Sequence, residues 1–111
     1  MSCIFCMIIE GEIPADFIYE SENVVAFNDL TPQAPTHILI VPKAHHENAA
    51  ATAAATPAVM AEMLTVAGSL ASAAGLDGYR TTFNTGSSAG QSVFHTHLHL
   101  LGGRAFAWPP G

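Results

Sequence analysis

Three histidines alternate with other residues near the C-terminal end of the chain, in the run His95-Thr96-His97-Leu98-His99. Strand side chains point alternately to opposite faces, so a predicted strand over 92–101 places the three imidazoles, here called the histidine row, on one face. The row could be a solvated polar face without a role. Two kinds of chemistry also suit it: metal binding, and nucleophilic catalysis by a neutral imidazole.

A loop of small residues precedes the histidine row. The segment 86–92 reads Gly-Ser-Ser-Ala-Gly-Gln-Ser. Small residues let backbone N–H groups approach an anion closely. The spacing fits neither the phosphate-binding loop of nucleoside triphosphatases nor the glycine fingerprint of dinucleotide-binding domains. Alone, this segment would indicate an ordinary surface loop. Directly before the histidine row, it predicts a phosphate cradle beside a nucleophile.

The only two cysteines, Cys3 and Cys6, have CxxC spacing. A redox pair would need a thioredoxin-like βαβ context, which the surrounding pattern lacks. Two inert thiols under an N-terminal helix are a second interpretation. A zinc site is a third, and it requires two further ligands from elsewhere in the chain.

Charge and length limit the partners that these residues could serve. The chain has 111 residues, half of them apolar, with 3 Lys and Arg, 9 Asp and Glu, 6 His and a net charge of −6. This length predicts one domain. So few cations exclude a general nucleic-acid binder and disfavour an anionic membrane surface. Neither a targeting segment nor an apolar stretch of roughly 20 residues is visible, so we expect a cytoplasmic protein without a membrane span.

Hydrophobic patterning predicts the elements that must position these residues. The N-terminal apolar residues Ile4, Phe5, Ile8 and Ile9 have helical spacing. A second helix begins after Thr56 as N-cap with Pro57 in its first position, and it ends at Gly75. Strands are predicted over 17–20, 24–27, 36–41, 79–84 and 92–101. Short connections between these strands favour antiparallel pairing, so the predicted fold class is α+β.

Four motifs together resemble the histidine triad (HIT) family, in particular its Hint branch. They lie at 29–37 (DLTPQAPTH), 42–45 (PKAH), 90–104 (GQSVFHTHLHLLGGR) and 108–111 (WPPG), and they span most of the chain. Thr96 departs from the family pattern, which usually has an apolar residue there. The resemblance implies a single HIT domain over 1–111, with an antiparallel sheet of about five strands and two helices. It also implies a homodimer whose sheets join, with Trp108 reaching the partner's site.

The resemblance further implies an activity. Hint-branch proteins typically hydrolyse the P–N bond of purine nucleoside 5′-phosphoramidates. By analogy His97 is the nucleophile, which forms a nucleotidyl-imidazole intermediate without a required cofactor. The other implied catalytic residues are His95, His99, Ser92 and His45. The residues implied to bind the purine nucleotide, which include Asp29 at the ribose, are Ile4, Phe5, Ile8, Phe27, Asn28, Asp29, Leu30, Asn84, Gly90, Gln91, Ser92, Val93, His97, His99 and Trp108.

The resemblance adds a ligand set to the zinc interpretation. Prokaryotic HIT proteins with a CxxC pair resemble one another in binding zinc through four positions, which here are Cys3, Cys6, His45 and His95. Four protein ligands would make such a metal structural. His37 and His46 receive no role. Two alternatives to the phosphoramidase stay open: dinucleoside polyphosphate hydrolysis or nucleotidyl transfer, and a nucleotide- or zinc-binding interaction module with negligible turnover.

Overall fold

A computed structural model describes residues 3–111 of the chain. Helix α1 (Ile4–Ile9) leads into the strand pair β1 (Tyr19–Glu20) and β2 (Val24–Asn28), and strand β3 (Thr36–Pro42) follows. Helices α2 (Ala49–Ala55) and α3 (Pro57–Ala73) come next. Strand β4 (Tyr79–Thr82), a short 3-10 helix η1 (Ser87–Ala89) and strand β5 (Leu98–Gly102) complete the described elements, and the predicted α+β class is confirmed.

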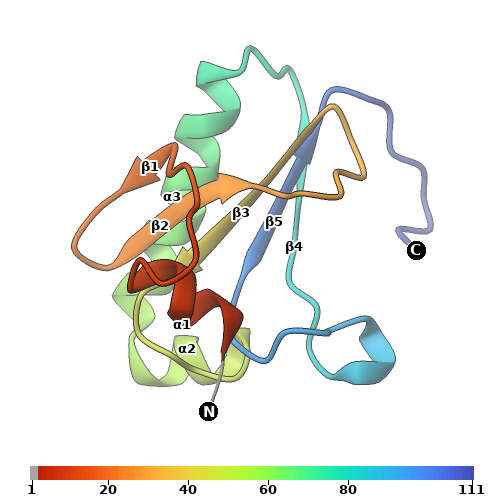
Figure 1. Cartoon of the computed structure of the whole chain (residues 1–111). Helices are drawn as coiled ribbons and strands as arrows, with labels where there is room; N and C mark the ends of the chain where they lie inside the picture. The colour runs from red at the N-terminus through yellow and green to blue at the C-terminus, as the bar shows by residue number, and fades with distance from the viewer. Residues whose placement is uncertain (1–2) are drawn as a thin grey trace.

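The five strands form one antiparallel sheet in the order β1-β2-β3-β5-β4 (Figure 1). The pairing of β3 with β5 is the step that matters for the site. It sets Leu39 opposite His99 and His37 opposite Leu101. Because side chains on one strand alternate between faces, this register places His37 on the same face of the sheet as His99.

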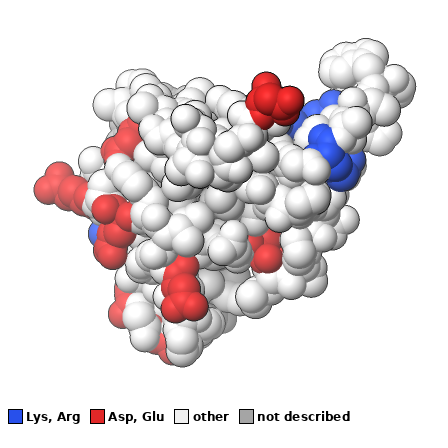
Figure 2. Space-filling model, turned by 90° about the horizontal axis from the view of Figure 1, so that it is seen from above, with Lys and Arg blue, Asp and Glu red and all other residues white. Residues whose placement is uncertain are grey.

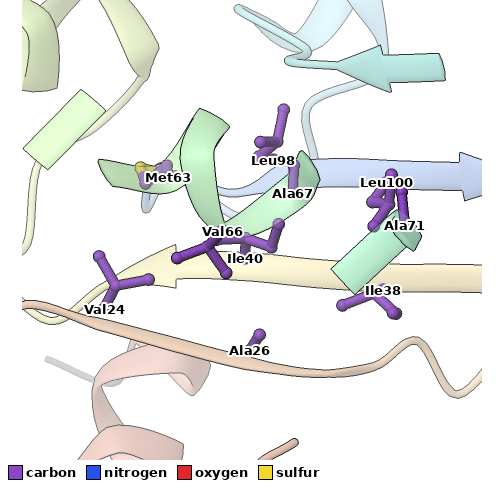
Figure 3. Packing of buried hydrophobic residues seen from close by; sticks show 10 residues of the cluster. All are labelled: Val24, Ala26, Ile38, Ile40, Met63, Val66, Ala67, Ala71, Leu98 and Leu100. Atoms are coloured by element: carbon purple, nitrogen blue, oxygen red, sulfur yellow. The ribbon is translucent and has the colours of Figure 1, made fainter. Parts of the chain in front are cut away.

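The two faces of the sheet are covered differently. Helix α3 covers one face, where it packs on a fully apolar cluster (Figures 1 and 3). Helix α1 covers part of the other face through Phe5, which packs with Phe27, Leu39 and Val41. The second cluster is smaller, and it leaves room beside α1 for the polar residues of the histidine row. The members of the larger cluster are Val24, Ala26, Ile38, Ile40, Met63, Val66, Ala67, Ala71, Leu98 and Leu100.

The ends of α3 follow the sequence signals. Pro57 occupies the first turn after Thr56, and Gly75 has a φ of +71° just beyond the last helical residues. The amide of Leu76 donates to the Ala71 carbonyl at 3.0 Å, and that of Gly75 to the Ser72 carbonyl at 3.0 Å. This pair of bonds is the Schellman ending, which a glycine stabilises because it has no Cβ.

The prediction of two helices was wrong, because the segment before Pro57 forms a separate helix, α2. Thr56 has φ −141° and ψ 72°, well outside the helical region. Proline disfavours the helical conformation of the residue before it and has no amide to continue the ladder. Asn48 begins α2 and accepts a hydrogen bond from the Ala51 amide at 3.0 Å. The chain therefore turns at Thr56 rather than running straight through.

The predicted strand over 92–101 was also too long, because β5 begins only at Leu98. Before that point, two separate hydrogen bonds replace the regular ladder, one from a side chain and one from the backbone. His95 donates from Nε2 to the Pro42 carbonyl at 2.8 Å, and the Thr96 amide donates to the His46 carbonyl at 2.9 Å. Proline has no amide to offer, so β3 cannot extend the ladder past Pro42. The strands at 17–20 and 79–84 are likewise shorter than predicted, at Tyr19–Glu20 and Tyr79–Thr82.

Within the described part of the chain, none of the helices has the length and apolar character that crossing a bilayer requires.

Candidate functional site

His97 lies at the centre of the histidine row, with a nitrogen free for chemistry. Its Nδ1 donates to the backbone carbonyl of His95 at 2.8 Å. The ring therefore carries its proton on Nδ1 and keeps a lone pair on Nε2. Phe5 and His99 each present a ring 5.0 Å from the His97 ring, between centroids. Although His97 precedes β5, all three imidazoles still line one side of the chain, as the alternation predicts.

His99 is held by a chain of hydrogen bonds with one possible direction. The Gln33 amide donates to Nδ1 of His37 at 3.0 Å, so the proton of His37 must lie on Nε2. That Nε2 is 2.9 Å from Nδ1 of His99 and donates to it. His99 then carries its own proton on Nε2, which is buried without a partner among residues 3–111. Buried polar groups normally have a hydrogen-bond partner, so this N–H lacks an acceptor that a ligand oxygen would supply.

His37, which sequence reasoning left without a role, thus belongs to the site. It is buried, with a relative exposure of 5%. The missing signal was the register of β3 on β5, which no single-strand pattern reveals. Burial, with the neighbouring His97 and His37, lowers the pKa of His99 to about 4 from its ordinary value. His99 is therefore neutral at physiological pH, as the hydrogen-bond chain requires.

Asp29 lies at the outer end of the same chain. Its Oδ1 accepts from the amide and the hydroxyl of Thr31, at 2.8 and 3.1 Å, and its Oδ2 lies 3.5 Å from Nε2 of His37. The ligand atoms of Asp29, His37 and His99 lie within 4.8 Å of one another, which is close enough for a metal. The hydrogen bond from the Gln33 amide to Nδ1 of His37 argues against a metal ion here, because it leaves Nε2 of His37 protonated and unable to bind a metal.

A second cluster lies at the other end of the histidine row, where thiols and imidazole nitrogens converge instead of forming a chain of hydrogen bonds. Sγ of Cys3 lies 3.4 Å from Nδ1 of His95, and Sγ of Cys6 lies 3.4 Å from Nδ1 of His45 and 3.6 Å from that of His95. The two Nδ1 atoms are 3.0 Å apart. The four ligand atoms all lie within 4.8 Å of one another. We call these four residues the thiol–imidazole cluster. They are the same four residues that the sequence analysis names as implied zinc ligands.

The spacing in this cluster fits a tetrahedral zinc ion. Zinc–sulfur and zinc–nitrogen bonds of ordinary length place sulfur and nitrogen ligands about 3.5 Å apart, and two nitrogen ligands about 3.3 Å apart. His95 is fully buried and donates from Nε2 to the Pro42 carbonyl, so its lone pair is on Nδ1 and faces the sulfurs. Such a carbonyl partner is the usual support of a metal-binding histidine.

Deprotonation of the thiols in this cluster is unfavourable without a nearby positive charge. Burial, and then the adjacent Cys3, raise the pKa of the Cys6 thiol to about 11. Burial likewise lowers the pKa of His95, against the effect of its bond to the Pro42 carbonyl. Thiolates here need a compensating positive charge, which a zinc ion provides. His45 lies in this cluster, and its predicted catalytic role stays a prediction.

One cavity collects most of the residues predicted to hold a purine base. It has a volume of about 230 Å³ and lies between α1 and β2. Phe5 is not in its wall but is buried beneath His97, where its ring packs at 5.9 Å from that of Phe27. The sequence reasoning missed the loop after α1, which forms one side. The wall consists of Ile4, Ile8, Ile13, Pro14, Ala15, Asp16, Phe27, Asn28 and Leu30.

A second cavity of about 480 Å³ lies beside the thiol–imidazole cluster. Ser92 and Val93, predicted to contact the phosphate, line it together with Glu47 and Phe94. Ile4 belongs to both cavities, so they adjoin at the start of α1. The remaining lining residues are Cys3 and His45.

The small-residue loop is held in shape by Gln91. Its Oε1 accepts from the Gly86 amide at 2.8 Å, and its Nε2 donates to the Glu47 and Val93 carbonyls at 2.7 and 3.1 Å. The side chain is thereby committed to the loop, so a nucleotide contact from Gln91 is left to its backbone. Gly90 has a φ of +91°, and a Cβ there would lie 3.7 Å from the Asn84 amide nitrogen. Asn84 therefore lies directly against this loop.

Trp108 is not brought to the site by its own chain. It is 84% exposed on a tail that runs away from the sheet (Figure 1). Phe106 anchors this tail: the guanidinium groups of Arg80 and Arg104 lie 5.0 and 4.3 Å from its ring centroid. Figure 2 shows most of the blue surface in one patch at the upper right and a small blue area at the left edge, whereas the red surface is scattered. The contact between Trp108 and a partner's site stays a prediction.

An α+β domain that aligns three histidines beside a small-residue loop, with an unpartnered N–H on His99, has the features of a nucleotide-phosphate site. Comparison with known proteins identifies the class. Residues 10–106 match the family described as the HIT domain. The chain belongs to the HIT family.

Relatives of similar length support this membership. An HIT-like protein of Synechococcus elongatus is 49% identical over 109 residues, which cover 97% of this chain and 96% of that protein. A 14 kDa zinc-binding protein of Zea mays is 49% identical over 112 residues, covering 97% and 87%. The crystal structure of an HIT family hydrolase from Legionella pneumophila Philadelphia 1 is 49% identical, with a TM-score of 0.94 and coverage of 99% and 100%. The five-stranded antiparallel HIT fold is thereby confirmed.

Proposed function

We propose that this protein is a Hint-branch hydrolase that cleaves the P–N bond of purine nucleoside 5′-phosphoramidates. The observation that carries the proposal is His97, whose Nδ1 is fixed on the His95 carbonyl at 2.8 Å while Nε2 stays available. A neutral imidazole in this tautomer is a competent nucleophile toward phosphorus and a competent leaving group afterwards. The solved Legionella relative is itself described as a hydrolase.

The reaction proceeds in two displacements. Nε2 of His97 attacks the α-phosphorus, an Nε2–P bond forms, and the P–N bond of the substrate breaks as the amine leaves with a proton taken from solvent. Water then attacks phosphorus and returns a proton to solvent, the Nε2–P bond breaks to restore the neutral imidazole, and the nucleoside monophosphate is released. Nε2–H of His99 donates to the phosphate oxygens in both steps, where developing charge is greatest.

The adjoining cavities give the substrate an orientation. The apolar cavity between α1 and β2 accepts the purine, and Asp29, which stands in sequence between the lining residues Asn28 and Leu30, accepts hydrogen bonds from the ribose hydroxyls through Oδ2. Ser92 and the backbone of Gly90 and Val93 contact the phosphate from the loop. The larger cavity beside Ser92 then receives the leaving group. A mainly apolar base pocket predicts little discrimination between adenine and guanine.

We also propose that Cys3, Cys6, His45 and His95 hold a structural zinc ion. The distances within the thiol–imidazole cluster support it, as does the zinc-binding relative from Zea mays. Four protein ligands leave no open position, so the ion supplies rigidity rather than chemistry. It fixes His95, whose carbonyl in turn orients His97.

A homodimer completes the proposal. Tyr79 at the sheet-edge strand β4 is 46% exposed, and Leu64 on α3 is 47% exposed, so apolar surface is available beside an open edge. Joining two β4 edges would cover both. Trp108 of each tail would then lie near the partner's leaving-group cavity. Sedimentation equilibrium checks this point, and a monomer at micromolar concentration would contradict it.

The decisive experiment compares the wild type with His97→Gly on a substrate panel. Adenosine and guanosine phosphoramidates, an acyl-adenylate and a dinucleoside polyphosphate distinguish the phosphoramidase from other HIT activities. We expect phosphoramidates to have the highest kcat/KM, and the variant to lose at least about a thousandfold in kcat while still binding adenosine monophosphate. Near-normal turnover by the variant would refute the mechanism, and no turnover by the wild type would favour an interaction module.

A further inference from the structure

Two buried hydroxyl groups lie directly behind the histidine row, on the side away from the proposed substrate. Oγ1 of Thr52 in α2 and Oγ1 of Thr96 are 2.7 Å apart. Both residues are almost completely buried, with relative exposures of 0% and 1%. A buried hydroxyl without a partner is costly, so this pair stabilises the structure only while both members are present.

Thr96 is also tied to the backbone before α2. Its amide donates to the His46 carbonyl at 2.9 Å, and its hydroxyl donates to the same oxygen at 3.3 Å. The hydroxyl of Thr52 can therefore donate to Thr96, whose own proton goes to His46. Two segments far apart in sequence are thus joined at one point by three hydrogen bonds.

The peptide group that Thr96 shares with His95 connects this arrangement to the nucleophile. The N–H of that peptide is the one bound by His46, and its C=O is the one that receives the Nδ1–H of His97. A peptide group is planar, so fixing its N–H end also fixes the direction of its C=O end. A hydrogen bond to the N–H also strengthens the C=O as an acceptor.

We propose that Thr52 and Thr96 are positioning residues, which hold the His95–Thr96 peptide so that its carbonyl keeps His97 in the tautomer that attacks phosphorus. They touch neither substrate nor metal and act only through this carbonyl. The inference rests on the proposed role of His97 as nucleophile. It assigns a task to the one residue of the histidine row segment, Thr96, that departs from the apolar pattern.

Four variants test the proposal. Thr96→Val keeps the shape and removes the hydroxyl, Thr96→Ser keeps the hydroxyl, and Thr52→Val/Thr96→Val replaces the buried polar pair with an apolar one. Thr65→Val is the matched control, because its hydroxyl lies on the exposed side of α3 and donates only to the Ala61 carbonyl. Each is measured for Tm, for kcat and KM with a fluorogenic adenosine phosphoramidate, and for imidazole tautomers by long-range ¹H–¹⁵N NMR.

Thr96→Val is expected to lower kcat roughly tenfold with little change in KM, a size typical of supporting residues behind a site. Its NMR spectrum should show a mixture of His97 tautomers in place of a single Nδ1–H form. Its Tm should fall by roughly 5 °C, because Thr52 loses its partner. Thr96→Ser should recover kcat to within about twofold, and Thr65→Val should resemble the wild type in every measurement.

The double variant separates positioning from stability. With no orphaned hydroxyl, its Tm should return toward that of the wild type, whereas kcat and the tautomer mixture should not recover. Recovery of kcat together with Tm, or an unchanged tautomer in Thr96→Val, would overturn the inference. The tautomer measurement needs no substrate, so it stands even if the wild type fails to hydrolyse phosphoramidates.

Discussion

The two ends of the histidine row carry the same residue type in opposite roles. Around His95, four atoms with available lone pairs converge on one point, and the His95 proton is turned away toward the Pro42 carbonyl. Around His99, donors and acceptors alternate from the Gln33 amide through His37, and the His99 proton is left without an acceptor among residues 3–111. Convergent lone pairs suit a metal, whereas an alternating chain fixes a tautomer and delivers a donor.

The difference arises from the partners rather than from the histidines. His95 precedes β5 and is surrounded by residues from the N-terminus and from the turn after β3. His99 lies inside β5 and faces the neighbouring strand. The proposed nucleophile His97 lies between the two, so each end can support it without competing for its ring.

Removing the thiols should have the largest effect at the His95 end. We expect Cys3→Ser/Cys6→Ser to bind less than 0.1 zinc per chain, against about one for the wild type, since hydroxyls replace thiolates in a four-ligand site. The free energy of unfolding should fall by at least about 3 kcal/mol. Metal analysis and urea unfolding measure these effects.

Chelation of the wild type provides an independent control for that variant. Removing the metal should lower the Tm of the wild type and leave that of the double serine variant unchanged. If wild-type protein purified without chelator contains no zinc, the proposed metal site at the His95 end of the histidine row is wrong.

Breaking the hydrogen-bond chain at the His99 end should reduce kcat and leave the metal in place. His37→Leu removes the group that fixes the His99 tautomer, so Nε2 of His99 is no longer held as a donor. We expect kcat to fall roughly thirtyfold, about 2 kcal/mol in transition-state stabilisation, with zinc content unchanged. Stopped-flow kinetics and metal analysis on one preparation check both parts. A loss of zinc in His37→Leu would show that the two ends are not separate.

Lowering the pH should reduce the free energy of unfolding through His99, by less than the substitutions above. The pKa of His99 is about 4 in the folded protein and near 6.5 in the unfolded chain, so the unfolded state binds the proton first as pH falls. The low pKa of His99 therefore contributes to the free energy of unfolding at neutral pH. This contribution is complete above pH 6.5 and is lost progressively as pH falls toward 4. At this half-buried site it amounts to about 1 kcal/mol.

The acid effect is measured as the difference between wild type and His99→Gln. Because zinc release also depends on pH, both proteins are unfolded in urea at pH 7 and pH 5, and only the difference between them is compared. The wild type should lose more stability than the variant. An equal loss would contradict the low pKa of His99.

Much of the fold could be predicted from local signals. The helical spacing of Ile4 and Phe5, the Pro57 and Gly75 boundaries of α3 and the β-branched run of β3 all depend on neighbouring residues, and each was confirmed. One error arose where a distant group decides, and the other where the effect of Pro57 on the residue before it was overlooked. Whether β5 extends before Leu98 depends on Pro42, and whether α2 is separate from α3 depends on the backbone of Thr56.

The candidate site divides in the same way. Residue types and spacing alone identified the histidine row, the CxxC pair and the small-residue loop as places where chemistry could occur. Each of these features is formed by residues within a few positions of one another in the sequence. The tertiary structure decided their partners: it brought His45 and His95 to the cysteines, joined His37 to His99 across two strands, and set Thr52 behind Thr96. Such pairings depend on strand register and helix placement, which are fixed only when the whole chain packs.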